Sequence, residues 1–129
     1  MHPYIALVTL LTVLLLAVTS GLVSRARGKY GVRAPATTGP DGFERAFRVQ
    51  ANTNESALMF LPALWVAGSV HRPDVAAALG LLWLVARILY VVTYLDPAKK
   101  RTVGFALGGV AIVALIAQGL WGVLGTLAM

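Results

Sequence analysis

Residues 4–23 have the sequence YIALVTLLTVLLLAVTSGLV, which contains no charged residue. A helix needs about 20 mostly apolar residues to cross the hydrocarbon core of a bilayer, so this stretch predicts a transmembrane helix. Three more long stretches follow, at residues 43–70, 74–95 and 103–127, although the first half of 43–70 is polar. Together the four stretches occupy most of the chain of 129 residues. They predict an all-α protein with a single domain, an integral membrane four-helix bundle.

The composition agrees with a membrane protein. Hydrophobic residues make up 58% of the chain and charged residues only 12%, against about 25% charged residues in soluble domains. The 11 Lys and Arg outnumber the 5 Asp and Glu, but they gather between the apolar stretches, which favours a membrane protein over a nucleic-acid-binding one. The chain has no cysteine, which excludes disulfides, cysteine nucleophiles and thiolate zinc sites. No metal site is expected.

The connections between the stretches indicate a topology. Basic residues concentrate in the first connection, residues 24–42, and in the third, residues 96–102. The positive-inside rule puts both connections in the cytoplasm and both termini on the far side, an N-out and C-out arrangement. The short loops and the Ala, Gly and Val content suit a bacterial inner membrane.

Two of the predicted helices carry a stripe of polar side chains at helical spacing. The stripe members are Arg45, Arg48, Asn52 and Glu55 on the second helix and Arg87, Tyr90 and Tyr94 on the third. A charge at the bilayer centre costs about 2.5–3.5 kcal/mol, so we expect the stripes to face each other rather than lipid. Guanidinium groups match carboxylates, amides match peptide groups and a carboxylate holds an ammonium group. The stripes therefore predict a pocket near the cytoplasmic surface where an anionic peptide meets a partner dissolved in the membrane.

The same residues have structural alternatives. Glu55 could form a buried ion pair with Arg87 or Arg48 that only fixes the register of the helices. The two tyrosines could belong to the aromatic belt at the membrane surface. Arg101 follows two lysines in a cytoplasmic turn, so it could be an ordinary topogenic charge.

The segment FERAFRVQANTNESALMFLPALWVAG, residues 43–68, resembles the signature of the MAPEG family, the membrane-associated proteins of eicosanoid and glutathione metabolism. The similarity is to the branch of cysteinyl leukotriene synthases and microsomal glutathione transferases, which carries a comparable FER…R.Q.N..E…FL..LW.AG pattern. TTGP at residues 37–40 also matches, as does an AR..Y...Y run at residues 86–94, with Arg101 seven residues further on. The resemblance covers roughly residues 20–105.

The resemblance implies a homotrimer of four-helix subunits that binds glutathione between neighbouring subunits at the cytoplasmic end. The positions it assigns to glutathione contacts are Arg27, Arg48, Gln50, Asn52, Glu55, Tyr90 and Tyr94, with Arg87 in the same network. Arg101 matches the arginine that holds the glutathione sulfur as a thiolate. The implied activity is that of a glutathione transferase, and also of a peroxidase. Glutathione would be the co-substrate, and a lipophilic electrophile or lipid hydroperoxide would arrive from the membrane lipid.

Three positions depart from the leukotriene-forming members of the family. Gly28, Ser56 and Val113 stand where those members have an arginine, a tyrosine and a lipid-clamping tryptophan. A leukotriene substrate therefore does not follow. One alternative is a non-catalytic, lipid-presenting member of the family, but that relative departs from the pattern at the positions of Arg48 and Glu55, which this chain retains. A small proton-coupled drug exporter would need a glutamate in the first helix, which has none.

Overall fold

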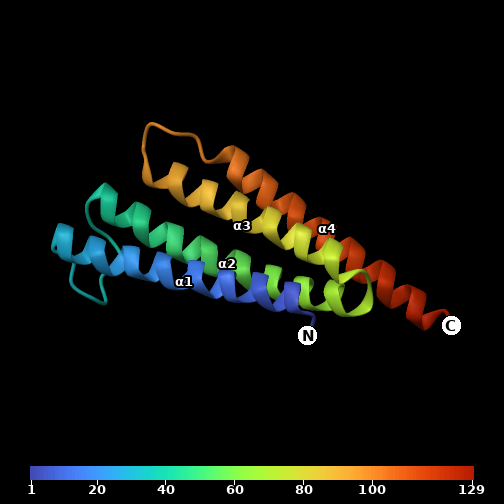
Figure 1. Cartoon of the computed structure of the whole chain (residues 1–129). Coiled ribbons are helices and arrows are strands. Elements are labelled where there is room, and N and C mark those ends of the chain that lie inside the picture. Colours follow the sequence, from blue (N-terminus) through green and yellow to red (C-terminus); the bar gives the residue numbers. More distant parts are fainter.

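A computed structural model describes all 129 residues. Most of them form four helices, and each helix runs antiparallel to the next one along the chain (Figure 1). The helices are α1 (Pro3–Tyr30), α2 (Asp41–Val70), α3 (Pro73–Leu95) and α4 (Thr102–Leu127). Both termini and the α2–α3 turn lie at one end of the bundle, and the other two connections lie at the opposite end. Helices α1, α3 and α4 are long and apolar enough to cross a membrane. Helix α2 is as long, but its first half carries the polar stripe.

Helix α1 is longer than the apolar stretch that predicts it. It continues from Val23 to Tyr30 and ends where Gly31 adopts a left-handed conformation with φ of 66°, donating its N–H to the carbonyl of Arg27. A glycine at this position is a common helix stop because it has no Cβ to oppose a positive φ. The helix therefore continues for about two turns beyond the apolar stretch that predicts the membrane span.

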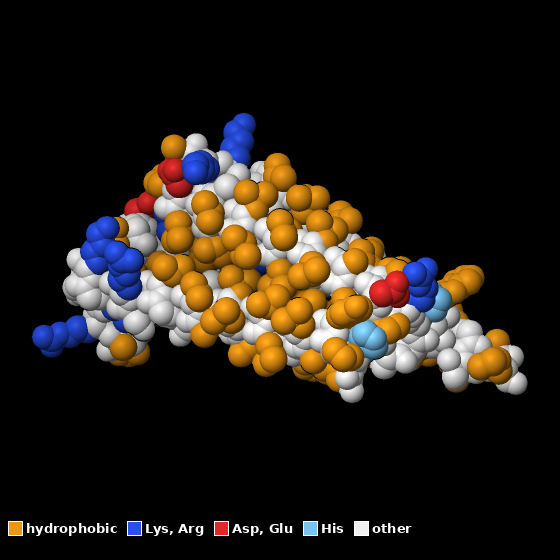
Figure 2. Space-filling view, viewed as in Figure 1, with side chains coloured by type: hydrophobic (Ala, Val, Ile, Leu, Met, Phe, Trp, Pro, Cys, Tyr) orange, Lys and Arg blue, Asp and Glu red, His pale blue; other side chains and the backbone are white.

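Helices α2 and α3 form the centre of the bundle. Helices α1 and α4 each pack on both of them and do not contact each other. In the core, the rings of Phe60 and Trp83 stack with centroids 4.0 Å apart, and the Trp83 indole N–H donates to the hydroxyl of Ser56 at 3.1 Å. Figure 2 shows hydrophobic side chains along the length of the bundle and most Lys and Arg side chains of this face at one end.

Two glycines let α4 approach its neighbours closely. A Cβ at Gly104 would lie 2.7 Å from the backbone nitrogen of Tyr90 and 2.9 Å from the carbonyl oxygen of Ala86 in α3. A Cβ at Gly122 would lie 2.9 Å from the carbonyl oxygen of Val70 at the end of α2. Small residues of this kind allow close helix contacts in membranes, and Gly104 fixes α4 against α3 beside the polar stripes.

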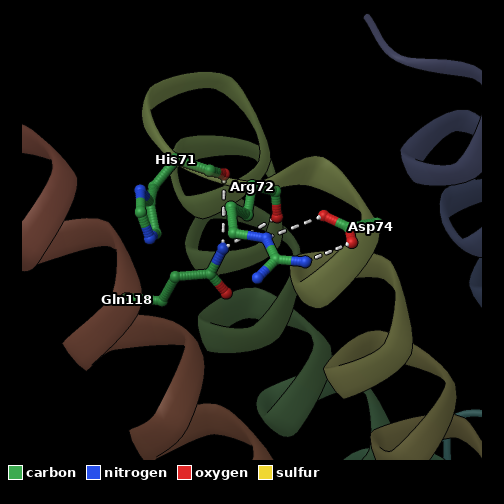
Figure 3. Close-up of polar contacts among 4 residues, drawn as sticks. All are labelled: His71, Arg72, Asp74 and Gln118. Carbon is green, nitrogen blue, oxygen red and sulfur yellow. Dashed lines mark hydrogen bonds and ion pairs between the residues drawn. The ribbon is translucent and has the colours of Figure 1, made fainter.

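The α2–α3 turn is held by a side chain from α4, as Figure 3 shows. The Gln118 amide donates to the carbonyl of His71 at 3.3 Å and to that of Arg72 at 3.0 Å. Arg72 also pairs with Asp74 at 2.8 Å, and this hydrogen bond raises the pKa of Arg72 above its ordinary value. Gln118 thus gives the His71 carbonyl a donor and adds a second donor to the Arg72 carbonyl, which already accepts from the Ala76 N–H at 3.1 Å.

Candidate functional site

The two polar stripes meet between α2 and α3. The Asn52 amide donates to the hydroxyl of Tyr90 at 2.7 Å, and the ring of Tyr90 lies 5.4 Å from that of Tyr94. The Arg101 guanidinium carbon lies 4.8 Å from the centroid of the Tyr94 ring. Arg45 contacts the same ring at 5.8 Å and donates to the Tyr94 carbonyl at 3.0 Å. A continuous polar row therefore leads from α2 across α3 to the start of α4.

Arg87 is buried in this row. It is only 4% exposed, and its guanidinium carbon lies 4.3 Å from the centroid of the Tyr90 ring. Its Nε and Nη1 atoms are buried and have no hydrogen-bond partner within the chain. Because a buried donor is costly when it stays unpaired, these nitrogens are the strongest sign in the bundle of a site for an anionic group.

The ion pair that the sequence offered as a structural alternative does not form. Glu55 is exposed, and the two ion pairs of the chain are Arg45 with Asp41 and Arg72 with Asp74. Glu55 therefore pairs with neither Arg87 nor Arg48, because it faces outward from α2 while Arg87 lies inside the bundle. The register of α2 and α3 depends instead on apolar packing and on the hydrogen bond between Asn52 and Tyr90.

A cavity of about 240 Å³ opens beside Arg87. Its polar lining comes from α2 and α3, and α4 adds apolar side chains together with Met59 of α2. The lining residues are Asn52, Glu55, Ser56, Met59, Arg87, Tyr90, Phe105, Gly109 and Ile112. Guanidinium, amide, carboxylate and phenol groups thus share one cavity with an aromatic ring and aliphatic side chains. Such a cavity can hold a zwitterionic or anionic molecule against an apolar one.

A second cavity of about 360 Å³ shares Asn52 and Glu55 with the first and adds Arg48. Its other lining residues are Thr37, Thr38, Glu44, Phe47 and Ala51. The α1–α2 loop therefore closes one side of the candidate site. The two cavities together bring five of the predicted residues into one region: Arg48, Asn52, Glu55, Arg87 and Tyr90.

Four of the predicted residues line neither cavity: Tyr94 and Arg101, which belong to the polar row, and Arg27 and Gln50, which do not. Arg27 donates to the carbonyl of Ala36 at 2.8 Å and lies 5.0 Å from the centroid of the Phe43 ring. Gln50 is two residues from both Arg48 and Asn52, so it projects from α2 about 200° away from them. Within one chain, the structure does not bring these two predicted residues to the others.

Some lining residues were absent from the sequence-based candidates. Thr37 and Thr38 line the second cavity and belong to the TTGP motif, so the sequence offered a signal for them. Arg45 lines neither cavity, but it contacts Tyr94, and its spacing in the polar stripe was a signal. Phe105 and Met59 offered none, because an apolar residue in an apolar helix looks the same whether it lines a cavity or faces lipid.

Comparison with known proteins points to a single family. The sequence model of the MAPEG family matches residues 5–121. An uncharacterized protein of Synechocystis is 48% identical over 119 residues, covering 92% of this chain and 87% of its own. Leukotriene C4 synthase of Bos taurus is 41% identical over 120 residues, which cover 93% of this chain and 80% of the synthase. Microsomal glutathione S-transferase 2 of Homo sapiens is 43% identical over 96 residues, covering 73% and 65%.

Proposed function

The chain belongs to the MAPEG family, and on this premise we propose that it is a membrane glutathione transferase, able also to reduce peroxides. The observation that carries the proposal is the cavity in which the unpaired nitrogens of Arg87 lie beside Asn52, Glu55 and Tyr90. Glutathione has two carboxylates, an ammonium group and two peptide amides, so every polar group of the cavity has a counterpart on it. Relatives named for glutathione transfer and leukotriene synthesis support glutathione as the co-substrate.

Each residue then has a chemical role. Arg48 and Arg87 bind the carboxylates of glutathione, Glu55 binds its ammonium group and Asn52 binds a peptide amide. Tyr90 and Tyr94 form the wall between the peptide and α4. Arg101 lies at the start of α4, next to Tyr94, and holds the sulfur.

One arginine is sufficient to activate the sulfur. A free thiol has a pKa near 8.5, and lowering it by two units requires about 2.7 kcal/mol. A guanidinium about 4 Å from the sulfur supplies about 4 kcal/mol at an effective dielectric constant near 20. The thiolate then attacks a lipophilic electrophile that enters from the bilayer along the apolar side formed by Met59, Phe105 and Ile112. With a lipid hydroperoxide, the thiolate attacks the outer oxygen and releases the lipid alcohol, and a second glutathione converts the resulting sulfenic acid to glutathione disulfide and water.

We further propose that the site is completed by a neighbouring copy in a homotrimer. Arg27 and Gln50 match glutathione-contacting positions of the family, yet in one chain they lie apart from both cavities. A second copy that supplied them would also cover Glu55, an exposed carboxylate on a membrane helix. We propose that this end of the single membrane domain faces the cytoplasm, in a bacterial inner membrane, and the basic connections support the cytoplasmic side.

The test is an ultraviolet difference titration of the purified, detergent-solubilised protein with glutathione. We expect a saturating thiolate absorbance that disappears in Arg101→Ala, while glutathione still binds. The matched control is Lys100→Ala, which removes the adjacent exposed cation and should keep the signal. Full thiolate signal in Arg101→Ala would refute the role of Arg101. Binding without thiolate in the natural protein would indicate a glutathione-binding protein. No binding by the intact oligomer would favour a lipid-presenting one.

The shared site has a separate test. The Arg27→Ala and Arg48→Ala variants should each have low transferase activity when expressed alone. Co-expression should restore part of the activity, because mixed oligomers contain some sites with both arginines intact. No recovery in verified mixed oligomers would mean that each site lies within one chain. Chemical cross-linking should stop at the trimer, and a product that stops at the dimer would contradict the proposed assembly.

A further inference from the structure

The basic residues at the end of α1 divide between two sides of the helix. At 100° per residue, Arg27 points about 160–200° away from Arg25 and Lys29. Arg27 turns toward the α1–α2 loop and α2 through its contacts with Ala36 and Phe43. Arg25 and Lys29 are exposed and take part in neither of the two ion pairs of the chain. Within one chain, Arg25 and Lys29 therefore lie outside the candidate site.

Arg25 and Lys29 continue the outward apolar face of α1. Four exposed aliphatic residues precede them within an arc of about 60° on the same side of the helix. They are Leu7, Leu11, Leu14 and Val18, with 37–59% of each residue exposed. The buried side of α1 lies elsewhere on the helix and includes Val8 and Thr12. One face thus runs from aliphatic side chains directly to two cations.

The position of the two cations matches the membrane boundary. From Tyr4, an exposed aromatic residue at the start of α1, to Arg25 the helix rises about 32 Å, close to the roughly 30 Å hydrocarbon core of a bilayer. Lys29 lies about 6 Å further along, at the depth of the phospholipid headgroups. Helix α1 contains no acidic residue that could neutralise the two cations. Figure 2 shows the basic side chains gathered at this end of the bundle.

We propose that the outward face of α1 binds an anionic phospholipid, with its acyl chains along Leu11, Leu14 and Val18 and its phosphate between Arg25 and Lys29. Charge complementarity selects the headgroup, because two adjacent cations favour a net negative lipid over a zwitterionic one. The aliphatic face alone would accept the chains of any lipid. This interaction does not rest on the glutathione chemistry, since neither cation lines either cavity of the candidate site.

The test measures lipid selectivity in vesicles of dioleoyl phosphatidylcholine that contain the reconstituted protein and trace spin-labelled phosphatidylglycerol or phosphatidylcholine. Electron paramagnetic resonance gives the fraction of each labelled lipid immobilised on the protein. We expect a preference for phosphatidylglycerol that weakens in high salt. In Arg25→Gln/Lys29→Gln the preference should fall by up to about fivefold for each charge removed.

The matched control is Lys99→Gln/Lys100→Gln, which removes two exposed charges from the other connection at the same end of the bundle. It should keep the preference for phosphatidylglycerol. An equal loss in both double variants would mean a general effect of surface charge, and no preference in the natural protein would mean that no such site exists. Dissociation of the oligomer by Arg25→Gln/Lys29→Gln, seen by native mass spectrometry, would assign this face to a contact between copies instead.

Discussion

Replacing Gly104 with alanine should separate activation of glutathione from its binding. The new Cβ would lie 2.7 Å from the backbone nitrogen of Tyr90 and 2.9 Å from the Tyr90 Cα atom. Ordinary contacts between such atoms begin near 3.5 Å, so α4 must withdraw from α3 by roughly 1 Å. Arg101 precedes Gly104 by one helical turn and would move away from Tyr94 with α4.

The expected magnitude follows from this displacement. Overpacking of this kind costs about 1–3 kcal/mol of stability, and a misplacement of about 1 Å near a reacting group can reduce the rate by 100-fold. The glutathione contacts that we assign to α2 and α3 stay in place. We therefore expect turnover and thiolate absorbance to fall by about 10- to 100-fold, while glutathione affinity changes by only a few-fold.

The assay combines the thiolate titration, isothermal titration calorimetry with glutathione and a thermal unfolding curve in detergent. Gly125→Ala is the matched control, because it makes the same change in the same helix where a Cβ would meet nothing within 4 Å. Its activity should equal that of the natural protein. If Gly104→Ala unfolds at the same temperature and forms as much thiolate as Gly125→Ala, the argument that this glycine positions Arg101 is wrong.

Three further predictions test separate parts of the structure. Asn52→Ala and Tyr90→Phe should each weaken glutathione binding. A double-mutant cycle measured by calorimetry should give a coupling energy of about 1 kcal/mol for the hydrogen bond between them, and additive effects would contradict a role for this hydrogen bond in binding. Gln118→Leu removes both donors to the α2–α3 turn and should lower stability in thermal unfolding by about 1–3 kcal/mol without changing glutathione binding at the far end. Trp83→Leu should destabilise more than Trp83→Phe, because only the phenylalanine keeps a ring stacked on Phe60; equal loss would disprove the stacking argument.

The sequence predicted the four helices because apolar length is a direct consequence of bilayer thickness. It underestimated α1, since the helix end depends on Gly31 and not on where the apolar residues stop. It also predicted that residues of α2 and α3 would meet, because each stripe has helical spacing. The bond between Asn52 and Tyr90 confirms this meeting.

The depth of each side chain was beyond sequence reasoning. Arg87 and Glu55 are both charged residues on polar stripes, yet the first is buried and the second exposed. That difference comes from the rotation of each helix in the bundle, which apolar packing sets over the whole helix length. Arg27 and Gln50 show another limit of sequence reasoning. They belong to the family pattern, yet within one chain they lie apart from both cavities.

The α2–α3 turn has a consequence for how the protein is made. Only His71 and Arg72 separate α2 from α3, so these helices form one hairpin that already contains Asn52, Arg87 and Tyr90. Synthesis proceeds from the N-terminus, and α4 therefore arrives last, bringing Arg101 to a preformed polar row. Under the proposed function, the residues assigned to glutathione binding are therefore in place during synthesis before the arginine assigned to its activation.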